Sequence, residues 1–185
     1  LKGSGQNLGS LSDLWTRTFT VNPEQTINYI TAHDNLCLYD RIVTEGVTSS
    51  NAPYQVALVR FGHGIMLVSQ GIPFIHCGDE FLRTKAVGPQ ASNAHNSYMF
   101  GIQMNQIDWA LKATNIDTFN YHKDLIAFRK ANACFRSNNT NDVGNVEIAD
   151  GVVKYKVGQY TVVLNPGSDL AKTFGTEVFN QNGAT

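Results

Sequence analysis

Two stretches of the chain have the side-chain pattern of strands, and each precedes a helical pattern. Residues 25–30 (QTINYI) are rich in β-branched and aromatic side chains, and residues 72–77 (IPFIHC) form a short, continuous apolar run after Gly71. Such a run predicts a strand that is covered on both faces. The helical patterns follow at residues 53–69 and 117–133. This alternation predicts two βα units of a mainly parallel sheet.

The two predicted helices differ in how much of their surface is apolar. Residues 53–69 are apolar on nearly all sides, which predicts a helix buried on more than one side, with close backbone packing at Gly62 and Gly64. Residues 117–133 carry one apolar stripe, and Lys123, Arg129 and Lys130 are expected outside it. The stripe consists of Tyr121, Leu125, Phe128, Ala131 and Phe135.

The pattern changes to short strands after about residue 137. Strands are predicted over residues 146–149, 152–157 and 160–164. Asp150-Gly151 indicates a type I′ hairpin turn, and Gly158-Gln159 suits a type II′ turn. The fold class is therefore α/β followed by all-β. Residues 1–136 form the first part, and an antiparallel module follows over residues 137–185.

Two βα units cannot close a sheet by themselves. A (β/α)8 barrel needs roughly 200 to 250 residues, whereas only 136 precede the antiparallel module. A strand that is covered on both faces also needs a neighbour on each edge. We therefore expect the chain to be the C-terminal part of a larger protein, with the N-terminal segment of the sheet lying outside it.

Composition narrows the class of protein. The 185 residues are 42% hydrophobic and 16% charged, which is typical of a globular protein. A formal charge of -1 without a basic run argues against nucleic-acid binding, and no apolar stretch approaches the roughly 20 residues of a membrane span. An odd number of cysteines predicts no disulfide framework, and favours buried thiols and a reducing, cytoplasmic compartment. The cysteines are Cys37, Cys77 and Cys134.

Polar clusters follow both predicted parallel strands. The first is His33-Asp34-Asn35, and the second contains His76, Asp79, Glu80 and Arg83. In a parallel sheet both clusters lie at the carboxyl edge, where ligands bind. Carboxylates beside histidines suit hydroxyl recognition and acid–base chemistry, although a His-Asp pair after a strand is more often a local hydrogen-bonded pair than a catalytic one. These residue types also include zinc and manganese ligands, but no HExxH-like spacing defines a metal site, and no GxSxG occurs.

Four segments in order resemble enzymes of the α-amylase superfamily, glycoside hydrolase family 13. QTINYITAHDN resembles the strand-seven region of that family, and QGIPFIHCGDEFLRTK resembles its strand-eight region. YHKDLIAFRKANACFR is similar to the last barrel helix, and GVVKYKVGQYTVVLNPG to the start of the C-terminal β-sandwich. The ending EFLRTK, followed by NSY and NQIDW, resembles type I pullulanases. The resemblance implies the last two βα units of a (β/α)8 TIM barrel plus part of a β-sandwich.

The resemblance also implies functions for single residues. Asp34 matches the aspartate that stabilises the transition state of a retaining glycosidase, and His33 matches a neighbour that binds the same sugar. Asn96 and Tyr98 are candidate substrate-binding residues. Glu80 and Arg83 are expected to support their loop through charged hydrogen bonds, and Trp109 and Tyr39 are either core residues or sugar-stacking surfaces.

The implied enzyme hydrolyses α-1,6 branch linkages in α-glucans such as pullulan, glycogen or limit dextrin. Its nucleophile and its general acid/base lie on earlier strands, so this segment alone is expected to be inactive. Alternatives are an isoamylase, an α-1,4-acting amylase, or a non-catalytic glucan-binding remnant. No cofactor is evident, and the sequence leaves calcium binding in the longer enzyme open. The expected partners are an α-glucan and the remainder of the barrel.

Overall fold

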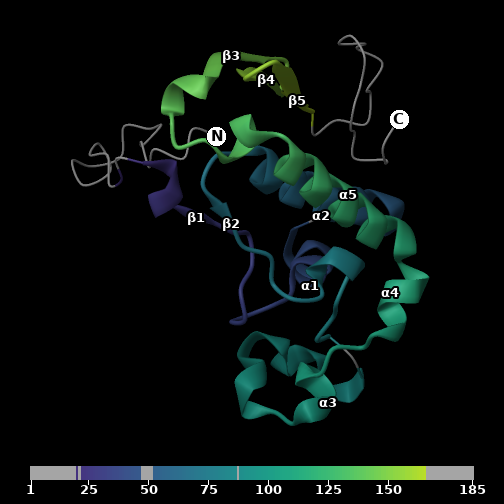
Figure 1. Ribbon diagram of the computed structural model, residues 1–185. Helices are drawn as coiled ribbons and strands as arrows, with labels where there is room; N and C mark the ends of the chain where they lie inside the picture. Colours follow the sequence, from purple (N-terminus) through teal and green to yellow (C-terminus); the bar gives the residue numbers. More distant parts are fainter. Residues whose placement is uncertain (1–19, 21, 47–51, 87, 166–185) are drawn as a thin grey trace, which may run out of the picture. The chain divides into compact units, whose positions relative to one another are not determined.

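The computed structural model describes residues 20, 22–46, 52–86 and 88–165 (Figure 1). These residues form two compact units. The first unit contains the described residues up to Asn28, together with Gly64–Phe74 and the described residues from Leu125 on. The second unit contains Tyr29–His63 and Ile75–Asp124.

The two predicted parallel strands pair in the first unit, over fewer residues than expected. Strands β1 (Ile27–Asn28) and β2 (Ile72–Pro73) run parallel, with Ile27 opposite Ile72. The predicted parallel order is therefore confirmed. The expectation that the second strand is covered on both faces is wrong within this chain, since the side chains of Ile72 and Phe74 are 48% and 44% exposed. Among the described residues, these two strands make up the whole sheet.

A buried arginine of helix α5 (Ile116–Ala131) binds the end of helix α2 (Ala52–Val68). The prediction that Arg129 lies outside the apolar stripe is wrong, because its side chain is 6% exposed. The last carbonyl groups of a helix have no partner within the helix, and the guanidinium supplies donors for that region. Its hydrogen bonds of 2.6, 2.7 and 2.8 Å go to the carbonyl oxygens of Leu67, Ser69 and Gly71.

The three predicted C-terminal strands are confirmed as an antiparallel sheet with the order β3-β4-β5 (Figure 1). They are β3 (Val143–Ala149), β4 (Val152–Val157) and β5 (Tyr160–Leu164). Strand β3 begins earlier than predicted and changes register between Gly144 and Glu147. A bulge of this kind cannot be read from alternation of polar and apolar residues. Residues 166–185 of the predicted module lie outside the described residues.

The hairpin turns have the predicted backbone conformations. Asp150 and Gly151 both have positive φ angles, 52° and 77°, as a type I′ turn requires. Gly158 has φ 56°, which suits the first position of a type II′ turn. One face of the sheet contributes to an apolar cluster. Its fully buried members are Phe135, Val143, Tyr155 and Val157.

The rest of the described chain consists of short helices. In the first unit, 3₁₀ turns occupy Pro23–Gln25, Ala133–Arg136 and Thr140–Asp142. The second unit contains α1 (Leu38–Arg41), a π-helical turn at Ile42–Gly46, the 3₁₀ segments η3 (Asp79–Phe81) and η4 (Gly88–Met99), α3 (Ile102–Asn105) and α4 (Ala110–Thr114). Its apolar core joins Leu38, Val59 and Leu82, and Tyr39 packs against this core. Close packing at Gly62 is confirmed, since a Cβ there would lie 2.8 Å from Ile30 Cδ1.

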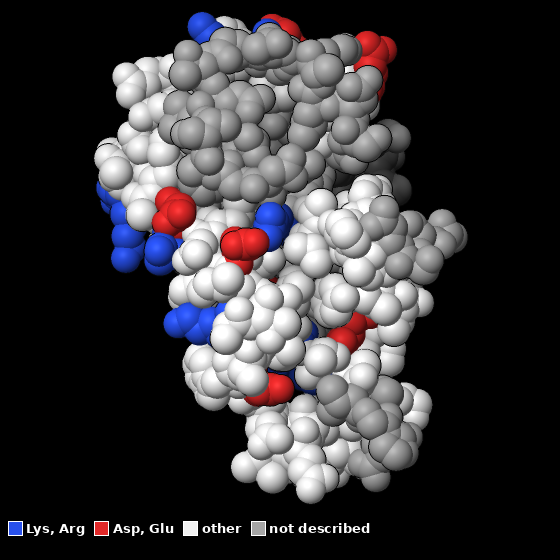
Figure 2. Space-filling view, turned by 90° about the vertical axis from the view of Figure 1, so that its right-hand side faces the viewer, with Lys and Arg blue, Asp and Glu red and all other residues white. Residues whose placement is uncertain are grey.

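The charged side chains and the cysteines differ in how their positions agree with the sequence predictions. On the face in Figure 2, charged side chains lie singly or in small mixed groups. Among the described residues, no helix has the length and apolarity needed to cross a bilayer. Cys37 is buried and Cys134 partly buried, but Cys77 is exposed, so the prediction of buried thiols is wrong there.

Two buried histidines form a hydrogen-bonded pair in the second unit. His63 Nδ1 lies 2.8 Å from His122 Nε2, and His122 Nδ1 lies 2.7 Å from the Thr118 carbonyl oxygen. Because a carbonyl only accepts, His122 carries its proton on Nδ1, and its Nε2 accepts from His63. This arrangement requires the His122 imidazole to be neutral.

We expect acid to destabilise the chain through this pair. Burial, with a smaller contribution from His122, lowers the pKa of His63 from 6.5 to about 3, and burial also lowers the pKa of His122. The unfolded state then binds more protons in this range, so the free energy of unfolding falls as the pH drops below about 6.5. His63→Asn keeps a donor and removes one titrating group, which should reduce this loss by roughly 2–3 kcal/mol at pH 4. Thermal melts between pH 4 and 7.5 test this, and parallel wild-type and variant curves would contradict it.

Candidate functional site

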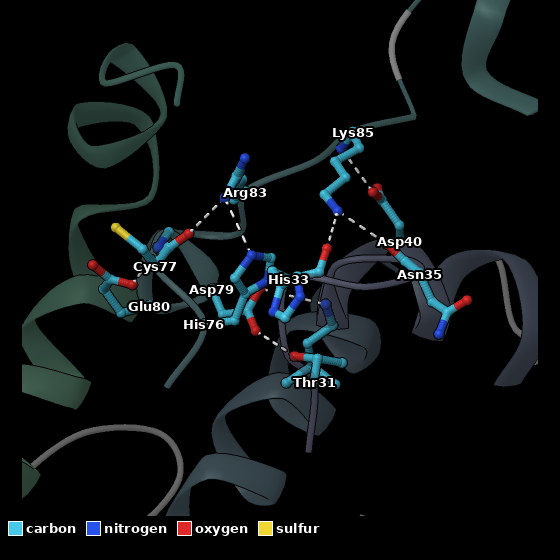
Figure 3. A network of polar contacts seen from close by, with 12 residues as sticks. Thr31, His33, Asn35, Asp40, His76, Cys77, Asp79, Glu80, Arg83 and Lys85 are labelled. Atoms are coloured by element: carbon cyan, nitrogen blue, oxygen red, sulfur yellow. Dashed lines mark hydrogen bonds and ion pairs between the residues drawn. The ribbon is translucent and has the colours of Figure 1, made fainter. Parts of the chain in front are cut away.

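The loop after β1 carries the first polar cluster, and a buried lysine holds its main chain (Figure 3). Lys85 is 2% exposed. Its Nζ donates to the carbonyl oxygens of His33, at 2.9 Å, and Asn35, at 3.1 Å. Asn35 has φ 61°, a left-handed conformation that asparagine tolerates. Lys85 therefore fixes the backbone on both sides of Asp34.

The position of Lys85 depends in turn on Asp40 of α1. The buried Asp40 carboxylate accepts from the Lys85 main-chain N–H at 2.7 Å and from the Thr84 hydroxyl. A buried ammonium is costly unless hydrogen-bonded acceptors surround it. Two carbonyl oxygens meet this requirement for Lys85, while the Asp40 carboxylate anchors the main chain of the same residue.

Asp79 links the second polar cluster to the first. Its carboxylate accepts from the Thr31 hydroxyl at 2.6 Å and from the Leu38 main-chain N–H at 3.4 Å. Together with the contact between Lys85 and His33, this brings the two clusters into one network, as their places after the two strands predict. Burial raises the pKa of Asp79 from 3.8 to about 6.

His76 is a neutral member of this network. Arg83 Nη1 lies 3.3 Å from His76 Nε2, and because arginine can only donate, Nε2 accepts and Nδ1 carries the proton. The Nδ1 atom lies 3.8 Å from Asp79 Oδ1, beyond hydrogen-bond distance, and is buried without a partner. Burial, followed by the positive charge of Arg83, lowers the pKa of His76 to about 4. His76 and Asp79 are therefore not an ion pair at neutral pH.

One group of potential metal ligands lies in the described part of the chain. The ligand atoms of Cys37, His76 and Asp79 are all within 4.8 Å of one another, and these residue types can bind zinc. However, His76 Nδ1 carries a proton, and burial together with Asp79 raises the pKa of the Cys37 thiol to about 12. Arg83 also places a positive charge against the imidazole. The protonated imidazole nitrogen, the protonated thiol and the adjacent guanidinium fit a buried hydrogen-bonded cluster better than a cation site.

His33 and Asp34 are exposed above this buried network. His33 Nε2 lies 3.5 Å from Asp34 Oδ1, and the side chains are 85% and 74% exposed. A rigid main chain with exposed polar side chains suits ligand contact, since the side chains are positioned before a ligand arrives. Their specific functions stay predictions.

The candidate residues Asn96 and Tyr98 belong to η4, which a chain of hydrogen bonds connects to the same network. Arg83 donates to the Asn105 carbonyl oxygen at 2.6 Å, and the Asn105 amide donates to the Ser97 carbonyl oxygen at 2.7 Å. Both candidate side chains are exposed, Tyr98 by 78%. Among the described residues, no hydrogen bond or ion pair joins them to His33 or Asp34. Their joint action on one sugar therefore stays a prediction.

Glu80 and Arg83 support the loop after β2 through charged hydrogen bonds, as expected. Glu80 accepts from the Gly78 main-chain N–H at 2.8 Å, and Arg83 donates to the Cys77 carbonyl oxygen at 3.1 Å. Sequence reasoning missed Lys85 and Asp40. Neither residue follows a helical or strand period, and a lysine in a polar stretch predicts an exposed side chain.

Replacing Asp79 should reveal the cost of its burial. The folded state binds more protons than the unfolded state between about pH 4 and 6, so the wild-type free energy of unfolding falls as pH rises through this range. Asp79→Asn keeps an acceptor and removes the charge. We expect the stability of the variant relative to wild type to improve by roughly 1–3 kcal/mol between pH 4 and 8. Urea unfolding at both pH values measures this, and a constant difference would contradict it.

The architecture defines a class of protein. Parallel strands with polar clusters after their carboxyl ends, followed by an antiparallel sheet, are typical of an α/β domain continuing into a β module. Ligand sites of such α/β domains lie at the strand ends, where the network around Asp34 and Asp79 is found.

The comparisons point to one group of enzymes. No protein-family model matches the chain. It is 35% identical over 121 residues to a pullulanase of Bacillus subtilis, covering 65% of the chain and 16% of that protein. It is 30% identical over 140 residues to an isoamylase of Flavobacterium, covering 63% and 17%. A variant pullulanase of Paenibacillus barengoltzii, solved with maltotetraose, has a TM-score of 0.73 at 32% identity over 90% of this chain and 26% of its own.

The chain is thus similar, over most of its length, to part of a pullulanase. The resemblance expected from its sequence motifs is confirmed. The chain spans about a sixth of the two curated relatives named above, covering 16% and 17% of their lengths.

Proposed function

We propose that this chain is a segment of an α-glucan hydrolase that cleaves α-1,6 branch linkages. The observation that carries the proposal is the exposed Asp34, whose flanking carbonyl groups are held by the buried Lys85, in a chain similar to pullulanases. The substrates would be pullulan, glycogen or limit dextrin.

Asp34 would act on the sugar at the cleavage point. Its carboxylate accepts hydrogen bonds from sugar hydroxyls and favours the positive charge of an oxocarbenium-like ring, so its contacts strengthen in the transition state. His33, 3.5 Å from Asp34, would donate to the same sugar. The carboxylates that serve as nucleophile and general acid/base would come from residues outside this chain.

In this proposal, β1 and β2 are the last two strands of a (β/α)8 barrel, with residues 1–136 belonging to the barrel and 137–185 to a β-sandwich. The exposed apolar side chains of Ile27, Ile72 and Phe74 support it, because further strands would cover them. A cytoplasmic location also belongs to the proposal, on the basis of the odd cysteine count.

Two alternatives retain support from particular observations. The similarity to an isoamylase favours a debranching enzyme with a different preference among branched glucans. In a non-catalytic glucan-binding remnant, the second alternative, the exposed His33 and Asp34 side chains would bind sugar without hydrolysis.

Hydrolysis assays separate these readings. Release of reducing sugar is measured from pullulan and from glycogen, with the 185-residue chain and with the full-length protein that contains it. We expect release from both glucans with the full-length protein and none above a denatured control with the chain alone. Release from glycogen only would favour the isoamylase alternative. No release with the full-length protein would overturn the proposal.

A further inference from the structure

The loop that carries Asp34 is held at both ends by the segment that follows β2 (Figure 3). At its start, the Thr31 hydroxyl donates to Asp79 Oδ2 at 2.6 Å. At its end, Lys85 Nζ donates to the Asn35 carbonyl oxygen at 3.1 Å. The three side chains that make these attachments are buried, whereas Asp34 and Asn35 are exposed. The loop is therefore a short exposed span between two buried attachments.

Lys85 determines how the main chain runs through Asp34. The His33 carbonyl, which accepts from Nζ at 2.9 Å, belongs to the peptide group that leads into Asp34. Because a peptide group is planar, holding its carbonyl oxygen also fixes the direction of the next bond to Cα. The second contact holds the carbonyl of Asn35, whose φ of 61° turns the chain directly after Asp34. One ammonium therefore constrains the backbone on both sides of the aspartate.

The Asp34 side chain depends on this backbone for its direction. Within the described ranges, its carboxylate has one polar contact, to the exposed His33 at 3.5 Å. An exposed contact of this length holds a side chain weakly. The direction in which the Asp34 carboxylate points is therefore set mainly by the main chain that Lys85 holds.

The burial of Lys85 is not explained by stability. Among the residues that the structure describes, its ammonium forms no ion pair and is bound by main-chain carbonyl oxygens. Desolvation of a buried charge offsets much of what its contacts contribute, so an apolar side chain often serves stability equally well. Costs of this kind are concentrated at functional sites. The fixed main chain at Asp34 gives a reason for a lysine at this position.

The main chain of Lys85 is anchored independently of its ammonium. The buried Asp40 carboxylate accepts from the Lys85 main-chain N–H at 2.7 Å and from the Thr84 hydroxyl. The same hydroxyl accepts from the Ala86 main-chain N–H at 3.0 Å. Removing the ammonium alone should therefore leave this segment in place, and the lysine side chain is a connection of fixed length between it and the Asp34 loop.

We propose that Lys85 is a positioning residue for Asp34, whose carboxylate it directs toward the sugar by holding the carbonyl oxygens of His33 and Asn35. The inference rests on the proposed function and gives Lys85 no contact with the substrate. A displacement of about 1 Å at a reacting group can cost up to about 10²-fold in rate. Because Asp34 would act mainly in the transition state, the effect of Lys85 belongs in kcat rather than in KM.

A double-mutant cycle in the full-length protein that contains this chain tests the inference. Lys85→Met keeps the length of the side chain and removes its donors. We expect kcat on pullulan to fall roughly tenfold, with KM within about threefold of wild type. In the Asp34→Asn background the same substitution should change kcat by less than about twofold, because residues that act as a unit are not additive. A merely structural role would lower kcat by the same factor in both backgrounds.

A second measurement does not require hydrolysis. Endoproteinase Asp-N cleaves the peptide bond before an aspartate, and cleavage in a native loop requires the loop to open locally. We expect cleavage between His33 and Asp34, followed by mass spectrometry, to be roughly fivefold or more faster in Lys85→Met than in wild type. Lys123→Met is the matched control. It removes an exposed lysine of α5 and should leave both the cleavage rate and kcat unchanged.

These outcomes separate the inference from the proposed function. An unchanged kcat in Lys85→Met, or an equal loss in both backgrounds, overturns the inference, while hydrolysis by the wild type upholds the proposed function. If the wild-type protein releases no sugar, the proposed function fails, and faster cleavage in Lys85→Met still supports the positioning of the loop. Unchanged cleavage overturns that positioning in either case. Should Lys85→Met unfold, Asp40→Asn replaces it, with an expected loss in kcat of about threefold that disappears in the Asp34→Asn background.

Discussion

In the full-length protein that contains this chain, Asp34→Asn is expected to lower kcat by about 10²–10³-fold with a much smaller change in KM. The substitution keeps the volume of the side chain and removes the charge that would face an oxocarbenium-like sugar. If the carboxylate acts mainly in the transition state, its loss appears in kcat rather than in ground-state binding. Steady-state kinetics on pullulan measure both quantities.

If Asp34 had only a structural function, Asp34→Asn would lower the melting temperature and leave kcat unchanged. The Asp34 carboxylate is 74% exposed, and its contact with His33 is 3.5 Å long, so removing its charge should change stability by about 1 kcal/mol or less. His33→Ala is the matched variant, and it should cost about 0.5–1.5 kcal/mol in activation free energy, the value of one neutral hydrogen bond. An unchanged kcat in Asp34→Asn, with a lower melting temperature, would contradict the catalytic function.

Replacing Arg129 by Met is expected to cost roughly 3 kcal/mol of stability, or about 6–12 °C in Tm. The guanidinium is 6% exposed and binds three carbonyl oxygens at the end of α2. Methionine fills similar volume but leaves these acceptors without this donor, and an unsatisfied buried polar group costs about 1–3 kcal/mol. Thermal and urea unfolding of the chain measure the loss.

The neighbouring lysine provides the control. Lys130 is exposed, so Lys130→Met removes a positive charge from the same helix end without breaking a buried contact. Its effect should stay within about 0.5 kcal/mol. Arg129→Lys should fall between the two, because a lysine keeps the charge but lacks the planar fork that reaches several acceptors. Equal losses for Arg129→Met and Lys130→Met would show that the carbonyl contacts contribute nothing.

Much of the local structure was predictable because its causes are local. The helix α2 and the strands β4 and β5 follow from hydrophobic period and turn chemistry, and Asp150-Gly151 adopts the predicted turn because both positions need positive φ. The short extent of β1 and β2 was not predictable. Strand length depends on neighbouring strands, which no window along the sequence contains.

The candidate site also has one part that was predictable from the sequence and one part that was not. Two polar clusters after parallel strands predicted a shared edge, and the contacts from Thr31 to Asp79 and from Lys85 to His33 join them. That Lys85 is buried depends on carbonyl groups some fifty residues earlier in the chain. Such long-range acceptors leave no periodic trace in the sequence, and the same is true of Arg129 at the end of α2.

The sequence by itself determined the order of elements, the hairpin turns, the motifs shared with pullulanases and the identity of Asp34 as the candidate residue. Only the tertiary structure decided which charged side chains are buried, because burial depends on partners distant in sequence. It made His76 neutral through burial and the charge of Arg83, raised the pKa of Asp79 through burial, and placed Trp109 on the surface against the buried Phe81. These outcomes share one physical reason: the local dielectric and the available hydrogen-bond partners are properties of the packed fold.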